Sequence, residues 1–143
     1  MSSAERPQAG CVVDTGIDGV VVSRVAAILD RRPGFIDRVL RRPEQDLLST
    51  VSSPTARAAS VAGRIAVKEA TMKALQGGIW DLGFLEIEVQ GGRTKPPRVA
   101  LHGRASQRAN DLGIDEVKVS LTHDGDLALA SASAVRWCTC ERS

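Results

Sequence analysis

The feature that most constrains the fold is a long helix predicted at residues 58–75. Apolar residues recur through it at helical spacing, and the Gly-Gly pair at 77–78 supplies the left-handed conformation that often ends a helix. A helical wheel predicts one water-facing stripe, made of Arg64, Lys68 and Thr71. Aliphatic residues fill the arcs beside the charged positions, so we expect a long central helix that other elements cover.

Glu69 and Lys73 form a second charged stripe on this helix, away from the water-facing one. An ordinary ion pair between positions i and i+4 explains them and contributes about 0.2 to 0.5 kcal/mol. The alternative is a functional carboxylate, which needs a charged partner because a carboxylate among apolar neighbours is costly unless it is paired or bound to a metal. Asp18, at the end of a predicted strand, is the candidate partner. Two carboxylates with waters and a phosphate oxygen are a common Mg²⁺ site in phosphoryl transfer.

The remaining elements follow from periodicity and turn residues. A short strand is predicted around residues 12–18, and helices around residues 23–32, 35–40, 43–48 and 104–112, with a loop at 49–57. Two hairpins are predicted, from strands 85–89 and 98–101, and from strands 117–121 and 127–130 around a turn at 123–126. Hairpins imply antiparallel pairing. We therefore expect an α+β fold with a mainly antiparallel sheet, a long central helix and shorter helices packed on one side.

Composition limits the function classes. The 143 residues, 43% hydrophobic and 25% charged, fit a single domain at residues 11–137 with a disordered tail at 1–10 and a C-terminal tail at 138–143. A net charge of +2 makes nucleic acid an unlikely main partner. Neither a leader segment nor a run of about 20 apolar residues is present, which predicts a cytoplasmic protein without a membrane span. The odd cysteine count indicates no disulfide framework, and we assign no function to Cys11, Cys138 and Cys140.

Three ordered segments together resemble the holo-acyl-carrier-protein synthase family of 4′-phosphopantetheinyl transferases. They are Gly16-Ile17-Asp18 with Arg24 beyond it, GRIAVKEATMKAL at 63–75, and VSLTHD at 119–124 followed by Ala128 and Ala130. The resemblance implies a homotrimer of the phosphopantetheinyl transferase-like fold with active sites between subunits. The implied reaction moves the phosphopantetheine arm of coenzyme A to a serine of an apo acyl carrier protein and releases adenosine 3′,5′-bisphosphate.

The resemblance also assigns roles to residues. Asp18 and Glu69 would hold Mg²⁺, and Glu69 and Lys73 would be catalytic, with the proton acceptor left open between Glu69, Lys73 and a metal-bound water. The coenzyme would contact Arg64, Lys73 and His123. An acidic carrier protein would dock on a basic surface of the first helices, through Arg24, Arg31 and Arg38.

Other interpretations stay open at this point. His123 on its own is compatible with a structural histidine, and the arginine-rich helices are compatible with a solvated basic patch. The main alternative function is a non-catalytic binding module that docks an acidic protein or nucleic acid, and a weaker one is an enzyme acting on another coenzyme A-like nucleotide. The chain also departs from the family pattern, with Ile65 where an aromatic residue is common and with an atypical GVVVS segment after Asp18.

Overall fold

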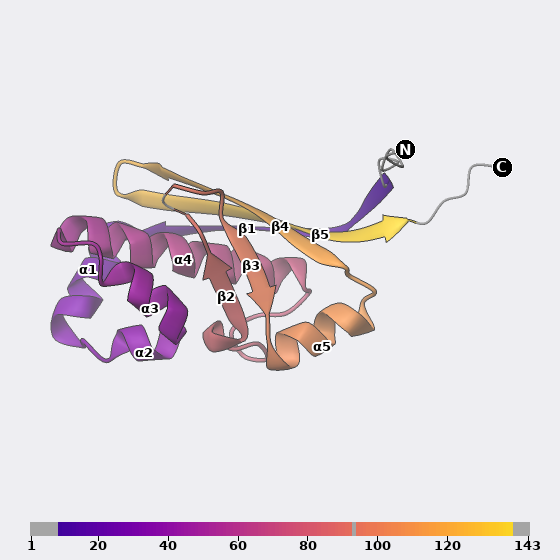
Figure 1. Ribbon diagram of the computed structural model, residues 1–143, viewed down its shortest axis with the longest axis horizontal. Coiled ribbons are helices and arrows are strands. Elements are labelled where there is room, and N and C mark those ends of the chain that lie inside the picture. Colours follow the sequence, from indigo (N-terminus) through magenta and orange to yellow (C-terminus); the bar gives the residue numbers. More distant parts are fainter. Residues whose placement is uncertain (1–8, 93, 139–143) are drawn as a thin grey trace, which may run out of the picture.

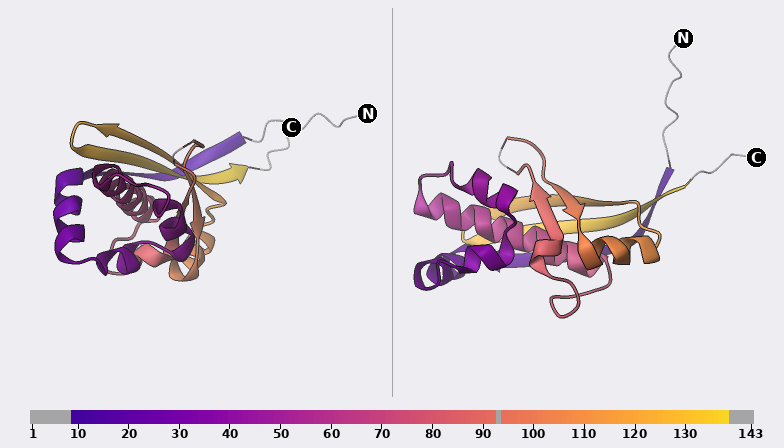
Figure 2. Two further views of the ribbon diagram at one scale, coloured as in Figure 1. Left: turned by 60° about the vertical axis from the view of Figure 1, so that its left-hand side comes forward. Right: turned by 60° about the horizontal axis from the view of Figure 1, so that its bottom comes forward.

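The computed structural model describes residues 9–92 and 94–138, and its centre is a long helix with a three-stranded antiparallel sheet along one side (Figure 1). The elements in chain order are β1 (Ala9–Val21), α1 (Val22–Arg31), α2 (Phe35–Val39), α3 (Arg42–Leu48), α4 (Pro54–Ala74), η1 (Phe84–Glu86), β2 (Ile87–Gln90), β3 (Arg98–Leu101), α5 (Gly103–Asp111), β4 (Glu116–Asp124) and β5 (Leu127–Cys138). The sheet has the order β1-β5-β4, and β2 and β3 form a separate hairpin. The α1–α3 helices lie on the side of α4 away from the sheet (Figure 2). The predicted fold class is confirmed.

Helix α4 begins earlier than the sequence predicted. Ser53 is its N-cap and accepts a hydrogen bond from the backbone N–H of Ala56, while Pro54 occupies the first turn. This is the usual chemistry of a helix start, because proline lacks the N–H that would be unsatisfied there. The prediction of a loop through residue 57 is therefore wrong over its last four residues.

The end of α4 also differs from the prediction. The left-handed residue is Gln76, with φ of 58°, and not one of the two glycines that follow it. The N–H of Gly77 donates to the carbonyl of Met72 at 2.9 Å, which closes the last turn. The two glycines correctly indicate that the helix ends here, but Gln76, just before them, is the residue that adopts the left-handed conformation.

Nearly every face of α4 is covered, because the helix separates two hydrophobic cores. Val61 packs with residues of α1–α3, and Met72 packs with residues of the sheet, β2 and α5. The predicted water-facing stripe is therefore wrong, since all three of its side chains are buried: Arg64, Lys68 and Thr71. The helical wheel assumed that charged side chains face solvent, whereas the two cations here are paired inside the protein.

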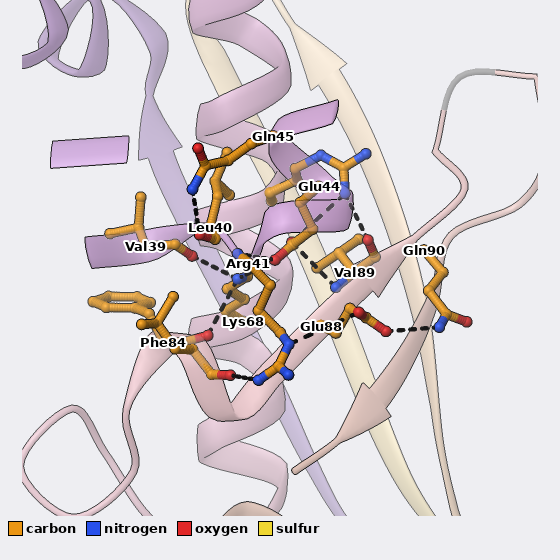
Figure 3. A network of polar contacts seen from close by, with 12 residues as sticks. Val39, Leu40, Arg41, Glu44, Gln45, Lys68, Phe84, Glu88, Val89 and Gln90 are labelled. Carbon is orange, nitrogen blue, oxygen red and sulfur yellow. Dashed lines mark hydrogen bonds and ion pairs between the residues drawn. The ribbon is translucent and has the colours of Figure 1, made fainter. Parts of the chain in front are cut away.

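Glu44 of α3 is the partner of these cations, in the network drawn in Figure 3. Its side chain is 1% exposed, and it accepts from Nζ of Lys68 at 2.8 Å while Nη1 of Arg64 lies 3.6 Å away. Lys68 also donates to the carbonyl of Val39, and Arg64 donates to the carbonyl of Val89. Burial lowers the pKa of both cations, and Glu44 opposes that effect. The network ties α3, α4 and β2 together.

Strand β1 runs through the position where the sequence predicted a turn. It continues to Val21, so Asp18 lies within the strand and not at its end. Similarly, β4 continues to Asp124, which places His123 in a strand and leaves the turn to Gly125 and Asp126. Both strands are longer than predicted because each pairs with β5 over nearly its whole length.

The structure describes only the inner residues of the two predicted tails, and these residues belong to strands. Residues 1–8 and 139–143 lie outside the described residues. Ala9 and Gly10 belong to β1 and Cys138 belongs to β5, where Ala9 pairs with Cys138. The Sγ atoms of Cys11 and Cys138 are 3.0 Å apart across these two strands.

Candidate active site

The first half of the candidate site forms where β1 crosses α4, and Gly16 makes the crossing possible. A Cβ atom on Gly16 would lie 2.0 Å from the carbonyl oxygen of Ala70, so only glycine lets the strand approach the helix this closely. Asp18 is two residues further along β1 and therefore points to the same face. The strand thus brings Asp18 against the part of α4 that carries Glu69 and Lys73.

Lys73 pairs with Asp18 across this contact. Its Nζ lies 3.1 Å from Oδ1 of Asp18 and donates to the carbonyl of Ile17 at 2.9 Å. The predicted alternative of a Glu69–Lys73 pair is not observed, since no ion pair joins these two described side chains. The ammonium instead bridges from the helix to the strand.

The carboxylates of Asp18 and Glu69 lie close together and repel each other. Burial, followed by the hydrogen bond and the charge of Asp18, raises the pKa of Glu69 to about 7, and Lys73 opposes the rise. Oδ2 of Asp18 is buried, and it has no hydrogen-bond partner within residues 9–92 and 94–138. Such an oxygen is costly unless a proton or a cation satisfies it.

This donor set fits a magnesium ion. Mg²⁺ is usually held by one or two carboxylates together with waters and phosphate oxygens. The described residues contain no group of three or more His, Cys, Asp or Glu side chains arranged for a metal, so a fully protein-ligated site is absent from that part of the chain. An unsatisfied oxygen of Asp18 beside a carboxylate of raised pKa is what a two-carboxylate magnesium site presents.

The second half of the candidate site surrounds His123 on β4. Gly63 of α4 allows β4 to approach, because a Cβ there would lie 2.9 Å from Leu121 and 3.3 Å from the imidazole ring of His123. The carbonyl of Ala59 accepts a hydrogen bond from Nε2 of His123 at 3.0 Å. His123 and Arg64 line a pocket of about 220 Å³ whose wall also includes Ser60, Gly91 and Gly92.

The two halves lie apart within one chain. Asp18 pairs with Ala130 of β5, and Ala130 pairs with Leu121 of β4, so Asp18 and the His123 strand are on opposite edges of the sheet. Two strand spacings separate these edges by about 10 Å. Along α4, Gly63 and Glu69 are about 9 Å apart and face different directions. The chain therefore presents a carboxylate half and a histidine half on different sides of α4.

The predicted docking arginines lie on the surface of α1 and α2. Arg24, Arg31 and Arg38 are exposed. Arg31 and Arg38 line a cavity of about 760 Å³ between the two helices, together with apolar side chains that the sequence analysis did not single out: Ile28 and Phe35. The structure therefore adds an apolar floor to the predicted basic surface.

Comparison with known proteins decides the family. A family model described as the 4′-phosphopantetheinyl transferase superfamily matches residues 14–132. The chain belongs to this superfamily.

Named proteins resemble this transferase over nearly their whole length. A holo-[acyl-carrier-protein] synthase of Moorella thermoacetica is 40% identical over 124 residues, which are 85% of this chain and 92% of that protein. The acyl carrier protein synthase of Plasmodium yoelii with ADP bound superposes with a TM-score of 0.82 at 27% identity, over 90% of this chain and 98% of the other. A Helicobacter pylori holo-[acyl-carrier-protein] synthase in complex with coenzyme A gives a TM-score of 0.69 at 29% identity, over 87% and 99%. The predicted resemblance and the assignment as an enzyme are confirmed.

The close approach of two strands to α4 was not predicted, although two glycines in the sequence indicate it. Gly16 and Gly63 are glycines inside a strand and a helix, and such glycines often mark a close backbone approach. The burial of Glu44 in α3 was not predicted. No helix in the described ranges is both long enough and apolar enough to cross a membrane.

Proposed function

We propose that this transferase moves the 4′-phosphopantetheine arm of coenzyme A to a serine of an apo acyl carrier protein and releases adenosine 3′,5′-bisphosphate. The observation that carries the proposal is the meeting of Asp18 and Glu69 at the Gly16 crossing. The names of the relatives, which are holo-[acyl-carrier-protein] synthases, support it. Coenzyme A in the Helicobacter pylori relative supports the coenzyme as substrate.

Asp18 and Glu69 would hold Mg²⁺ beside the pyrophosphate of the coenzyme. When bound, the ion supplies positive charge that stabilises the diphosphate leaving group. The unsatisfied Oδ2 of Asp18 and the raised pKa of Glu69 both support this assignment.

Glu69 and Lys73 would act on the reacting groups. The serine oxygen of the carrier forms a bond to the phosphorus next to the pantetheine arm, and the bond from that phosphorus to the adenosine bisphosphate breaks. A carboxyl with a pKa of about 7 suits a general base at neutral pH, so Glu69 would accept the serine proton directly or through a water. Lys73, exposed and already aimed at Asp18, would neutralise phosphate oxygens.

The pocket beside His123 would take the nucleotide end of the coenzyme. The buried guanidinium of Arg64 lines this pocket, donates to the carbonyls of Val89 and Gly91 and faces Glu44, so it would contribute positive charge beside a phosphate. His123 has one ring nitrogen committed to Ala59 and the other available for the coenzyme.

The acidic face of the carrier would dock on Arg24, Arg31 and Arg38. The exposure of these arginines and the apolar cavity between α1 and α2 support this role. Electrostatic complementarity of this kind speeds association and falls with ionic strength.

We assign the active form to a homotrimer with active sites between subunits. The separation of Asp18 and His123 on opposite edges of the sheet supports this assembly, because a second copy can place its His123 beside the carboxylates of the first. Exposed apolar side chains on β1, Val12 and Ile17, offer surface for such a contact.

A transfer assay tests the function. Incubation with coenzyme A, Mg²⁺ and apo acyl carrier protein should add one phosphopantetheine group to the carrier, as measured by mass. Asp18→Asn and Glu69→Gln should each abolish the addition, and Glu116→Gln, an exposed change on β4, should not. Absence of any mass change across several carriers would refute the proposal.

Complementation tests the intersubunit site. Glu69→Gln and His123→Ala should each be inactive alone, and a mixture unfolded and refolded together should regain activity, because some interfaces combine an intact Glu69 with an intact His123. A mixture as inactive as its components would show that both residues must come from one chain.

A further inference from the structure

The turn between β4 and β5 holds the start of α1, although about 100 residues separate them in sequence. Asp126 of this turn accepts three hydrogen bonds from the helix start. Its backbone carbonyl accepts from the N–H of Val22 at 2.8 Å, and its Oδ1 accepts from the N–H of Ser23 at 2.9 Å. Its Oδ2 accepts from the hydroxyl of Ser23. The turn and α1 lie at the same end of the molecule (Figure 1).

Helix α1 needs this external cap. Its N-cap residue, Val21, has an apolar side chain that cannot accept a hydrogen bond, and its first turn contains no acidic residue. A helix of ten residues is marginal without tertiary support. A carboxylate at the N-terminus satisfies orphan N–H groups and complements the helix dipole. Asp126 therefore caps the N-terminus of α1 from a distant part of the chain, whereas α4 is capped by its own N-cap residue, Ser53.

The position of Asp126 connects the separate parts of the proposed active site. Asp18 lies four residues before α1 on the strand that leads into the helix, and Arg24 directly follows the capped Ser23. His123 lies three residues before Asp126 and pairs with Ala128 of β5. The same turn thus fixes α1 relative to the strands that carry Asp18 and His123.

We propose that Asp126 is a positioning residue that sets the carrier-docking helix α1 relative to the carboxylates at which the carrier serine must react. The inference rests on the proposed function, in which Arg24 and Arg31 of α1 meet the carrier. Without the Asp126 cap, the first turn of α1 frays and Arg24 loses its fixed place. The carrier then binds more weakly, whereas the coenzyme pocket at His123 keeps its structure.

The sign of the effect separates positioning from simple electrostatics. Removing a negative charge beside a surface that binds an acidic carrier should strengthen binding, since it reduces repulsion. Loss of a positioning cap should weaken binding. Asp126→Ala is therefore expected to act against the direction that its charge alone dictates.

The experiment compares four proteins: the parent chain, Asp126→Ala, Asp126→Asn and Asp124→Ala. Asp126→Ala should raise KM for the apo carrier on the order of fivefold, the effect of losing a typical cap, with KM for coenzyme A and kcat unchanged. Asp126→Asn retains an oxygen that accepts from Ser23 and should restore most of the affinity. Asp124→Ala removes the same charge from the neighbouring position and should not raise KM. Amide hydrogen exchange in the first turn of α1 should quicken only in Asp126→Ala.

Each outcome decides the matter. An unchanged or lower carrier KM in Asp126→Ala, or an equal rise in Asp124→Ala, would overturn the inference. Ser23→Ala removes one of the three hydrogen bonds while keeping the backbone cap, so it should raise KM by about twofold even if Asp126→Ala folds poorly. Arg24→Ala separates the inference from the function. If Arg24→Ala and Arg31→Ala leave the carrier KM unchanged, the docking role itself fails; if they raise it and Asp126→Ala does not, only the positioning role fails.

Discussion

Replacing Glu69 by glutamine should stabilise the metal-free protein while abolishing transfer. The pKa of Glu69 is held at about 7 by burial and by Asp18, against about 4.5 in the unfolded chain. Between these pH values the folded protein binds more protons than the unfolded chain, so stability falls as pH rises from about 4.5 to about 7 and is constant above. Below that range both states are protonated and the penalty is absent.

The magnitude follows from the raised pKa. At about 1.4 kcal/mol per pKa unit, the rise from 4.5 to about 7 gives a full penalty at pH 8 of at most about 3 to 4 kcal/mol. Glu69 is only half-buried, so solvent screening reduces the penalty to about 1 to 2 kcal/mol. Glutamine occupies nearly the same volume without the charge. Glu69→Gln should therefore raise the free energy of unfolding by that amount at pH 8, which corresponds to a Tm increase of several degrees.

The assay is denaturant or thermal unfolding at pH 5 and pH 8, with EDTA or with excess Mg²⁺. In EDTA the stabilisation by Glu69→Gln should be present at pH 8 and greatly reduced at pH 5. Mg²⁺ should raise the Tm of the parent chain at pH 8 by mass action and have little effect on the variant. The control Glu116→Gln should change stability by less than about 0.5 kcal/mol at either pH. A variant that is no more stable than the parent at pH 8, or equally stabilised at both pH values, would refute the reasoning.

Three further predictions concern packing and the chain ends. Gly16→Ala should separate β1 from α4 and reduce transfer about a hundredfold through misplacement of Asp18. Gly19→Ala should cost far less, because a Cβ there comes closest to the flexible side chains of Leu129 and Leu127, and equal losses in the transfer assay would contradict the close-approach role of Gly16. Glu44→Ala should lower the free energy of unfolding by about 3 to 5 kcal/mol, because it leaves two buried cations without their anion. A loss below about 1 kcal/mol in calorimetry would contradict the stabilising role of this network. In a Cys140→Ser background, oxidised glutathione should link Cys11 to Cys138, which mass spectrometry detects as the loss of two hydrogens. If only mixed disulfides with glutathione form, the two sulfur atoms do not approach each other as described.

Much of the fold could be predicted because its signals are local. The hairpin of β2 and β3 and the helix stop at Gly113 follow from alternation and from glycine at positive φ, and the structure agrees to within one or two residues. The ends of β1 and β4 could not be predicted, because pairing with β5 extends both strands beyond their own apolar patterns. The burial of Arg64 and Lys68 was also inaccessible. It depends on Glu44, which lies at least 20 residues earlier in a different helix.

For the candidate site, the sequence indicated which residues take part but not where they lie relative to one another. Ordered motifs pointed to Asp18, Glu69 and His123, but no spacing along the chain could show that Asp18 and His123 occupy opposite edges of one sheet. Two glycines set this geometry, because Gly16 brings the β1 edge onto α4 and Gly63 does the same for the β4 edge. Strands at both edges of the sheet therefore pack closely against α4. This packing fixes the spacing between the side of the helix that carries the carboxylates and the side that faces His123. A substrate that must contact both sides needs either a path around α4 or a second copy of the chain, and a second copy keeps each half rigid while it completes the other.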